Sequence, residues 1–343
     1  MKLEYSVLPV ARFPEAIELI PEEPEGFERN LIFWNWKNSI PSIDNHKTIV
    51  FGAFDGNLLA GVCSFQPNDF IINGKKYLLH LVTDVVMAPD YRGKGLFSGF
   101  FTWCLANLEN SEGTYLVASK MAKDIYTRRF EYKNLGRLSC YFAFANIEHL
   151  KHAKRGYKRA LLHILSIING RKKYTEDKEF TSGSFVLPPN INNMQNEKEN
   201  KIRRYITREY LDWRYCSHPW RKYTFVGDKQ GKYEHGFAIL DGARIVELIT
   251  TNETAAKEII QNCINEIGKN KSPIAYCVQL EVPQERIAYL KAGFLKWPLK
   301  NKPFGLLQPP ELFVKPRNGS LVGDILVKRK NWKFSNGDIG PEA

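Results

Sequence analysis

The feature that most constrains the fold of this chain is a glycine-punctuated turn between an apolar strand and an amphipathic helix. Residues 77–87 form an apolar run typical of a strand, Pro89 ends it, and residues 92–95 read Arg-Gly-Lys-Gly. Beyond the turn, apolar residues recur at the three-and-four spacing of one helix face; they are Phe97, Phe100, Phe101, Cys104, Leu105 and Leu108. The sequence therefore predicts the order strand, basic turn, helix N-terminus.

This order has a chemical use, because the first amides of a helix lack an intrahelical partner and carry the positive end of the helix dipole. Gly93 and Gly95 would let a pyrophosphate approach these amides, and Arg92 and Lys94 would add positive charge. A glycine turn before a helix is also common as a plain connection. From the residues alone, an anion site and a simple connection both stay open.

The run from Val86 to Leu96 resembles the acetyl-CoA signature of the GNAT superfamily of N-acetyltransferases, in which Arg or Gln is followed by two residues, Gly, one residue, and Gly or Ala. The signature maps onto Arg92, Gly95 and Phe97, so a phenylalanine fills the last small position. The resemblance implies acetyl-CoA as co-substrate and no metal. It also implies a set of cofactor-binding residues, namely Val85, Val86, Met87, Arg92, Gly93, Lys94, Gly95, Leu96, Phe97 and Ser98.

The resemblance further implies direct transfer of the acetyl group to an amine, with backbone amides of residues 85–87 near the thioester. In the family, a Tyr after the fifth strand lies near the CoA sulfur, and Tyr126 is the matching candidate for the general acid. A packing role for Tyr126 stays open. Asp84 is the first candidate for the base, with His80 and Glu131 as alternatives.

A chain of 343 residues is long for one domain and suggests two. Residues 174–201 are polar and rich in Asn, Glu and Lys, which is typical of a linker. We therefore expect an α/β protein of two tandem GNAT-like domains with mixed central sheets flanked by helices. The predicted ranges are 1–165 for the acetyl-CoA-binding domain, 166–200 for the linker or long loop, and 201–343 for an acceptor-side or structural domain.

The element pattern supports this reading in both halves. The first half predicts helices at 14–20 and 27–37, strands at 48–54, 58–66 and 114–118, a short helix at 124–130, and turns at Asp55-Gly56-Asn57 and Asn73-Gly74. The second half predicts strands at 223–226, 234–240 and 244–250 and a helix at 254–267. Its connection 250–254 contains neither glycine nor a basic residue, although Tyr289 to Phe294 resembles the family's Tyr-x-x-x-Gly-Phe run. We therefore expect a degenerate cofactor loop there.

Residues 207–219 resemble a run found in a bacterial tandem-GNAT subgroup. Thr207 suits a helix N-cap, and the aromatic residues around Trp213 suit a core. Arg214 could anchor an acidic partner or loop. Upstream, residues 151–173 form a basic stretch around an apolar run, which suits either a solvated surface helix or one that binds lipid or nucleic acid.

The formal net charge of +12 suits an anionic ligand, but it does not identify one. The six cysteines show no metal-ligand or disulfide spacing. Without a signal peptide pattern or a long apolar segment, a cytoplasmic protein with no transmembrane segment is expected.

Three functions remain. The first is an acetyl-CoA-dependent N-acetyltransferase whose partner is a small-molecule amine, such as an amino sugar. The second is a tandem-GNAT aminoacyl transferase that uses tRNA, against which the intact CoA-type loop argues; no DNA partner is expected. The third is a non-catalytic CoA-binding module, which the departures at Phe97 and Phe130 would fit. The acceptor and the oligomeric state are not predicted.

Overall fold

The computed structural model describes residues 2–20, 30–42, 44–118, 123–146, 201–228, 233, 235–270, 272–280, 283–296 and 310–339. The chain divides into two compact units, each built from segments that are distant in the sequence. Unit 1 comprises Met1–Gly136, Glu199–Trp220 and Pro310–Asn331, and unit 2 comprises Arg137–Lys198, Arg221–Pro309 and Trp332–Ala343. The two units are described separately below.

Unit 1 is built on a mixed sheet with the strand order β1-β2-β3-β4-β5-β14-β6, and β8 pairs with β3. Its strands are β1 (Glu4–Val7), β2 (Ile49–Asp55), β3 (Leu58–Ile72), β4 (Lys75–Met87), β5 (Gly113–Ala118), β6 (Lys133–Arg137), β8 (Arg203–Arg204) and β14 (Glu311–Pro316). β4 and β5 are parallel, whereas β3–β4 and β5–β14 are antiparallel. The predicted turns at 55–57 and 73–74 join β2 to β3 and β3 to β4.

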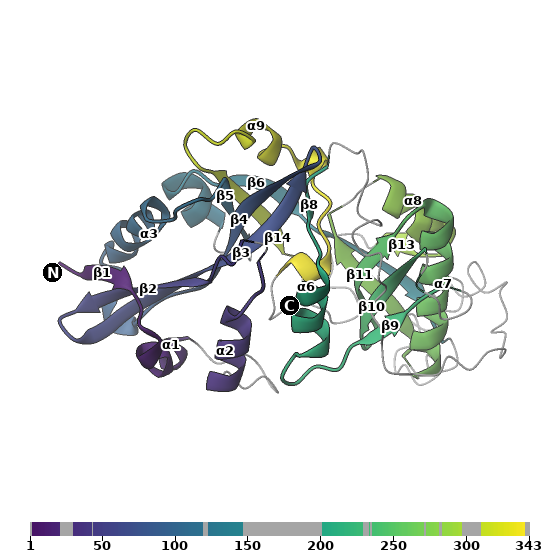
Figure 1. Ribbon diagram of the computed structural model, residues 1–343, viewed down its shortest axis with the longest axis horizontal. Coiled ribbons are helices and arrows are strands. Elements are labelled where there is room, and N and C mark those ends of the chain that lie inside the picture. Colours follow the sequence, from purple (N-terminus) through teal and green to yellow (C-terminus); the bar gives the residue numbers. More distant parts are fainter. Residues whose placement is uncertain are drawn as a thin grey trace, which may run out of the picture. The chain divides into compact units, whose positions relative to one another are not determined.

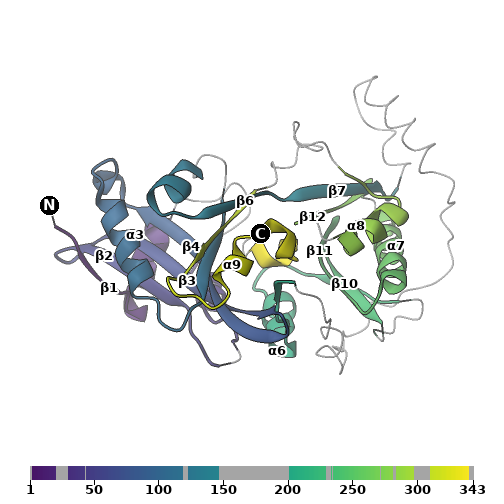
Figure 2. The same ribbon diagram turned by 90° about the horizontal axis from the view of Figure 1, so that it is seen from above.

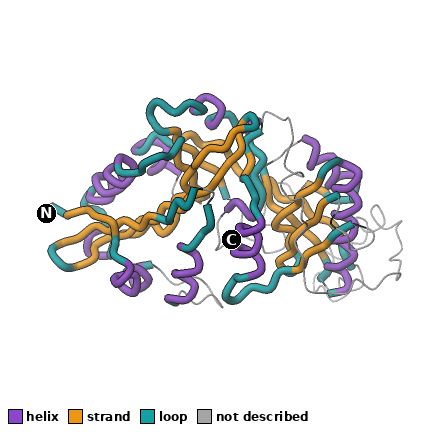
Figure 3. Tube along the Cα trace, viewed as in Figure 1, coloured by secondary structure: helices purple, strands orange, loops and turns teal. Residues whose placement is uncertain are grey.

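Helices cover both faces of the unit 1 sheet (Figures 1 and 3). They are α1 (Phe13–Leu19), α2 (Leu31–Asn38), α3 (Leu96–Ala106), α6 (Arg208–Leu211) and α9 (Gly323–Leu326), with π-helices at Ile125–Arg129 and Asp212–Cys216 and 3-10 turns at Val10–Arg12, Pro89–Tyr91 and Arg329–Asn331. The apolar face of α3 packs on one side of the sheet through Phe100, Phe101 and Cys104. On the other side, α1 and α2 bury Phe13 and Trp34.

The aromatic run 207–220 belongs to unit 1, where it packs against α2. Thr207 caps α6 by accepting a hydrogen bond from the amide of Tyr210, as its position predicts. The indoles of Trp36 and Trp213 stack with centroids 5.1 Å apart, and each donates to the other's main-chain carbonyl at 2.9 and 2.8 Å. Arg214 is 2% exposed, and the contacts between Trp36 and Trp213 fix this run to α2.

Unit 2 has its own mixed sheet, in the order β13-β7-β12-β11-β10-β9. Its elements are β7 (Ser139–Phe144), β9 (Thr224–Val226), β10 (Gly236–Asp241), β11 (Arg244–Thr250), α7 (Glu253–Lys269), β12 (Ile274–Gln279), α8 (Pro283–Lys291), β13 (Leu295–Lys296) and a 3-10 turn (Asn336–Ile339). β11 and β12 are parallel and are joined by α7. Figure 2 shows α7 and α8 side by side against this sheet.

The two units do not follow the predicted ranges 1–165 and 201–343. β14 pairs with β5 from Glu311 to Pro316, which places part of the C-terminal region in unit 1. β7 pairs with β12 over six residues, which places residues 139–144 in unit 2. A boundary placed at a polar stretch could not reveal these exchanges, because strand pairing over a long sequence separation leaves no local signal.

The structure can also be compared with the predicted elements of the second half, the cysteines and the basic stretch. The strands predicted at 223–226, 234–240 and 244–250 and the helix at 254–267 match β9, β10, β11 and α7. All six cysteines are unbonded, and all but Cys216 are buried. The basic stretch 151–173 lies outside the described residues, as do residues 174–200 of the predicted linker. Within the described part of the chain, no helix is long and apolar enough to cross a membrane.

Candidate functional site

The candidate site begins where β4 and β5 separate. Their parallel register covers only Leu79 to Leu81 of β4, opposite residues 113–115 of β5. β4 then continues to Met87, and its residues 83–86 are partly exposed. The described residues show no further pairing between these two strands, so the main chain of β4 is available to an extended ligand along this edge.

A β-bulge distorts β4 at this separation. Val86 lies opposite Val62 and Thr83 opposite Ser64, so two residues of β4 face one of β3. One of these two β4 residues, Asp84, has a φ of 51°, a left-handed conformation that is costly for a residue with a side chain. The bulge therefore changes the direction of the β4 main chain at the site.

An ion pair holds the bulge in place. The Lys37 ammonium of α2 lies 2.5 Å from the Asp84 carboxylate, and the two side chains are 0% and 1% exposed. Thr83 donates a second hydrogen bond to that carboxylate at 3.2 Å. The carboxylate is therefore committed to a buried ion pair, and losing either partner of such a pair is strongly unfavourable. The geometry therefore favours a positioning role for Asp84 over a role as proton acceptor.

The other two candidates for the base are placed differently. His80 is 2% exposed, its Nδ1 lies 3.0 Å from the Ser111 hydroxyl, and burial lowers the pKa of its imidazole to about 4. Ser111 donates its own proton to the Gly113 carbonyl, so the imidazole must be the donor in its contact with Ser111. The Glu131 carboxylate is 84% exposed and lies 3.2 Å from the Lys315 ammonium. The structure does not bring His80 and Glu131 together with Asp84 in one cluster.

The turn after β4 has the geometry of an anion cradle. Gly93 and Gly95 have φ values of 74° and 76°, and Gly95 is the N-cap of α3 without a side chain to bond the first amides. A Cβ atom at either glycine would meet nothing within 4 Å, so the space before the helix is open. Arg92 donates to the Met87 carbonyl at 2.7 Å and thereby joins the turn to the end of β4. The amides at the α3 N-terminus are thus presented to an incoming anion.

The first turn of α3 explains the phenylalanine in the signature. The Phe97 ring packs on Phe101 and Phe130, each with centroids 5.5 Å apart. Its ring therefore packs against the core, while its backbone amide stays in the first turn of the helix. Ser98 accepts a hydrogen bond from Arg129 at 3.1 Å. Arg129 is a further cation beside the cradle that the motif did not indicate; its signal was only the basic pair at 128–129.

Tyr126 lies on the π-helix that follows β5. It is 9% exposed, and its ring packs against Phe101 and Tyr132 with centroids 5.9 and 5.6 Å apart. Burial, with a smaller contribution from Cys63, raises the pKa of the Tyr126 phenol. The hydroxyl therefore keeps its proton and can act as a hydrogen-bond donor.

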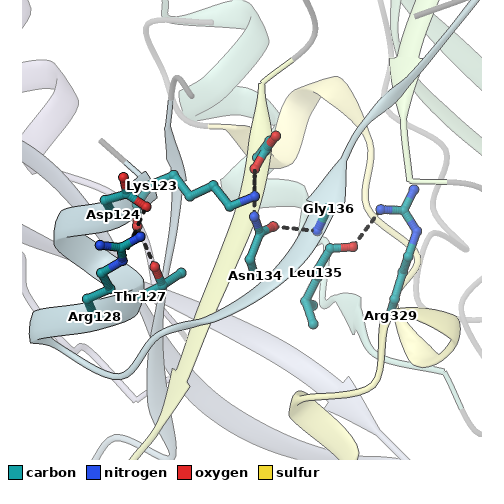
Figure 4. A network of polar contacts seen from close by, with 9 residues as sticks. Lys123, Asp124, Thr127, Arg128, Asn134, Leu135, Gly136 and Arg329 are labelled. Atoms are coloured by element: carbon teal, nitrogen blue, oxygen red, sulfur yellow. Dashed lines mark hydrogen bonds and ion pairs between the residues drawn. The ribbon is translucent and has the colours of Figure 1, made fainter. Parts of the chain in front are cut away.

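A polar network fixes the segment that carries Tyr126 (Figure 4). The Lys123 ammonium lies 3.9 Å from the Glu311 carboxylate of β14, and Asn134 of β6 donates to the same carboxylate at 2.6 Å. Thr127 donates back to the Lys123 carbonyl at 2.9 Å. The π-helix is thus anchored to two strands of the unit 1 sheet.

These features together form one chemical arrangement. An open strand edge, a helix N-terminus with free amides, and cations at 92, 94 and 129 suit a long ligand with a pyrophosphate group. The described residues contain no group of three or more His, Cys, Asp or Glu side chains that could hold a metal ion.

Comparisons with known proteins agree with this geometry. The family model of the acetyltransferase (GNAT) domain matches residues 23–134, which contain β4, the cradle and Tyr126. A comparison with curated proteins finds no match. Similar solved structures include GCN5-related N-acetyltransferases from Kribbella flavida (12% identity, TM-score 0.54, 92% of this chain and 72% of that chain) and from Anabaena variabilis (12%, 0.53, 92% and 73%).

A conserved protein of unknown function from Enterococcus faecalis is also similar, with 12% identity and a TM-score of 0.54 over 92% of this chain and 73% of that chain. At these identities the likeness establishes the fold alone. Residues 23–134 carry a GNAT acetyltransferase domain, and the chain has an α/β GNAT fold with mixed sheets.

Proposed function

We propose that the protein is an N-acetyltransferase that moves an acetyl group from acetyl-CoA directly to an amine, with unit 1 as the catalytic unit. The observation that carries this proposal is the open N-terminus of α3, capped by Gly95, at the end of a bulged strand that has parted from its neighbour. A pyrophosphate fits the first feature and a pantetheine arm the second.

The proposed roles follow the course of the ligand. Gly93, Gly95 and the amides at 96 and 97 hold the pyrophosphate, and Arg92, Lys94 and Arg129 add positive charge. The main chain at 85–87 pairs with the pantetheine and polarises the thioester carbonyl. The Lys37–Asp84 pair acts through the bulge, because it fixes the direction in which these amides point.

The chemical step needs a neutral amine, which attacks the thioester carbon, forms the C–N bond and displaces the CoA thiolate. We propose that the Tyr126 hydroxyl donates a hydrogen bond to the departing sulfur. Its raised pKa favours hydrogen bonding over complete proton transfer, because a tightly held proton is a poor acid. The amine proton leaves to water at the acceptor site, since Asp84 is held by Lys37.

We further propose that unit 2 is a GNAT-like fold without a working cofactor loop. Its strand–helix–strand order β11-α7-β12 parallels β4-α3-β5 of unit 1. The connection from β11 to α7 offers neither glycine nor a basic residue, and the N-terminus of α7 is capped by the Asn252 side chain. Acetyl-CoA should therefore bind only once per chain.

Calorimetry and a thiol-release assay test this function. The full chain is titrated with acetyl-CoA, CoA and unacylated tRNA, and thiol release is then followed with a panel of small amines. The proposal expects one acetyl-CoA per chain and amine-dependent thiol release. A stoichiometry near two would remove the single-site proposal. Binding without release by any amine would favour a non-catalytic module, and tRNA binding in preference to acetyl-CoA would favour the aminoacyl transferase.

A further inference from the structure

Unit 2 contains a second place where two parallel strands separate. Within the described residues, the ladder between β11 and β12 covers only two positions, Arg244 opposite Tyr276 and Ile245 opposite Cys277. Beyond them, β11 continues to Thr250 with β10 on its other side. In unit 1, the corresponding separation of β4 and β5 forms the open strand edge of the candidate site. The function proposed above gives the opening in unit 2 no ligand.

The two openings differ in what lies in them. Residues 83–86 of β4 are partly exposed, whereas residues 246–249 of β11 are all buried. The C-terminal segment, residues 332–339, lies at the opening in unit 2 and pairs with the end of β12. The amide of Leu280, the residue that directly follows β12, donates to the Phe334 carbonyl at 2.8 Å in an antiparallel bridge. The segment thus binds a strand end through its main chain.

The neighbouring residue, Ser335, connects the same segment to β11. Its hydroxyl lies 3.0 Å from the Glu247 carboxylate of β11 and 3.2 Å from the Asp338 carboxylate, and it donates to one of them at a time. Asp338 also accepts from the Ser335 amide at 2.7 Å, beside the 3-10 turn Asn336–Ile339. This turn contacts both β11 and β12 (Figure 2). Two consecutive residues, Phe334 and Ser335, therefore bridge the strands beyond the end of their ladder.

The side chains of the segment alternate between buried and partly exposed positions. Trp332 is 0% exposed and Phe334 is 1% exposed, whereas Lys333 and Ser335 are partly exposed. This alternation is typical of an extended strand that presents every second side chain to one surface. Extended peptides are recognised in this way, through main-chain hydrogen bonds to a strand and pockets for alternate side chains. Buried aromatic side chains are common anchors of such contacts.

We propose that the opening between β11 and β12 is a peptide-binding groove, and that residues 332–339 are its resident peptide. The groove selects an extended peptide with aromatic residues at the positions of Trp332 and Phe334, followed by a hydroxyl residue that donates to Glu247. The inference goes beyond the proposed transferase function and does not depend on it, because it concerns peptide binding by unit 2. Unit 2 thereby holds a segment of protein where unit 1 leaves a strand edge open.

Attachment to the chain makes the resident peptide a strong competitor. An attached segment has an effective concentration on the order of millimolar, so a free peptide of the same sequence should bind the wild-type chain only weakly. Weakening the resident segment should open the groove. Phe334→Ala/Ser335→Ala removes one aromatic anchor and the hydroxyl that reaches Glu247, but it leaves the strands of the groove unchanged.

Fluorescence anisotropy with full-length chains and no acetyl-CoA tests the groove. The probe is a labelled synthetic peptide with the sequence of residues 332–339. We expect it to bind the double variant at least tenfold more tightly than the wild-type chain, and we expect the same peptide with both substitutions to bind neither chain. Equal binding of the probe to the two chains, or no binding to a double variant whose circular dichroism shows a native fold, would overturn the groove.

Hydrogen exchange gives a residue-level test that also applies if the double variant does not fold. Ser335→Ala removes only the hydroxyl, so the Leu280 amide, which the segment covers, should exchange at least fivefold faster than in the wild-type chain. The Tyr276 amide of the same strand is bonded to the Ala243 carbonyl at 3.0 Å and should exchange at its wild-type rate. Equal rates for the Leu280 amide in the two chains would overturn the resident role of the segment.

The matched control for this variant is Ser320→Ala. Ser320 also donates to a carboxylate, that of Glu112 in unit 1, at 2.7 Å. Its removal should leave the exchange of the Leu280 amide unchanged. Equally fast exchange of that amide in Ser320→Ala and Ser335→Ala would assign the effect to general destabilisation and would overturn the inference.

Titration with acetyl-CoA separates the groove from the transferase proposal. The double variant Phe334→Ala/Ser335→Ala should still bind one acetyl-CoA per chain, because the Asn252 side chain still caps α7. A rise from one to two in this variant alone would show that the opening is a cofactor cleft covered by the segment. That result would overturn the peptide groove and leave the transferase proposal for unit 1 in place, whereas peptide binding by a chain that does not bind acetyl-CoA would do the reverse.

Discussion

Both units contain a junction from a strand to a helix, but they differ in whether a side chain bonds the first amides of the helix. In unit 1, residues 88–95 separate β4 from α3, and the helix is capped by a glycine in a left-handed conformation. No side chain bonds the first amides of α3. These amides remain available to a ligand.

In unit 2 the helix satisfies its own N-terminus. Thr251 and Asn252 alone separate β11 from α7, and the Asn252 side chain accepts from the Ala255 amide at 2.9 Å. Glu253 in the first turn of α7 adds a negative charge, which lies 2.5 Å from the Lys291 ammonium of α8. An incoming phosphate would have to displace the cap and approach an acidic side chain.

The difference teaches that a junction from strand to helix can leave the first helix amides open or bond them to a side chain, depending on the residue at the helix N-cap. A glycine cap has a cost in helix stability, because amides remain unsatisfied until a ligand arrives.

The backbone conformation of the strand before the helix also differs between the two units. Among the described residues, Asp84 gives β4 a non-glycine position with positive φ, whereas β11 has none. Unit 1 thus combines local strain with an open binding feature, as functional sites often do.

The largest expected effect tests whether the strained bulge depends on its ion pair. Lys37→Met leaves the Asp84 carboxylate buried without a counter-ion, so we expect a loss of about 3–5 kcal/mol in the free energy of unfolding. The double variant Lys37→Met/Asp84→Gly removes both charges and places a glycine at the position with φ 51°, so it should recover most of that loss. Chemical denaturation of both variants measures the difference.

The same pair of variants distinguishes positioning from proton transfer. If Asp84 acts through the bulge, the double variant should regain activity together with stability. A stable double variant that stays inactive would instead return the role of base to Asp84. Equal stability of the single and double variants would show that the ion pair does not hold the bulge.

The second prediction is that His80 of unit 1 makes the folding stability of the protein decrease at acid pH. Burial lowers the pKa of His80 to about 4 from 6.5, so the unfolded chain binds a proton between these values and the folded chain does not. The stability contributed by neutral His80 is fully present above pH 6.5 and is lost as the pH falls toward 4, by about 3 kcal/mol. Unfolding measured at pH 7 and pH 4.5 should show a smaller decrease for His80→Asn. His235→Asn, at an exposed histidine of unit 2, is the control; an equal decrease in wild type and His80→Asn would refute the assignment.

The third prediction concerns a variant that fills the open space before the N-terminus of α3. Gly95→Glu places a bulky, negatively charged side chain in the open space before α3 and strains a residue with φ 76°. We expect acetyl-CoA affinity to fall at least hundredfold, which corresponds to about 2.7 kcal/mol. Gly293→Glu is a matched control, because Gly293 of unit 2 also has a positive φ and open space. Similar losses in both variants would show that the cradle is not specific to unit 1.

The sequence predicted the parts of this protein that are local. Residues 92–98 contain their own turn chemistry, since Gly93, Gly95 and the helix pattern lie within one short stretch, and the structure has the turn there. The β2–β3 and β3–β4 hairpins were predicted for the same reason, from Asp55-Gly56-Asn57 and Asn73-Gly74. A turn requires only a few neighbouring residues to agree.

The parts that depend on distant residues were not predicted. Lys37 ends a helix rich in aromatic residues and looks like an ordinary surface charge until the fold brings it to Asp84, which lies 47 residues away in sequence. β14 lies almost two hundred residues from β5, so no local pattern could assign it to unit 1. The bulge at Asp84 also left no sign in the sequence, because an aspartate within a strand pattern does not by itself indicate a left-handed conformation.

The last prediction concerns the phenol of Tyr126, a feature of unit 1 whose role is either chemical or structural. Tyr126→Phe keeps the ring packed against Phe101 and removes only the hydroxyl. If the hydroxyl donates a hydrogen bond to the departing thiolate, kcat should fall about tenfold while acetyl-CoA affinity stays nearly constant. Because burial raises the pKa of this phenol, the wild-type enzyme should show no loss of activity from its ionisation up to about pH 10.

Tyr132→Phe is the matched control for this loss, because Tyr132 lies in the same cluster but its hydroxyl is bonded to Thr114 at 2.6 Å. It should lower the melting temperature without a selective effect on kcat. A decrease in kcat below about threefold in Tyr126→Phe would assign that residue to packing, whereas a decrease above about hundredfold would show complete proton transfer. The melting temperature must be measured beside each rate, since a partly unfolded variant also loses activity. Only a loss of kcat at unchanged stability would make the π-helix a catalytic part of unit 1.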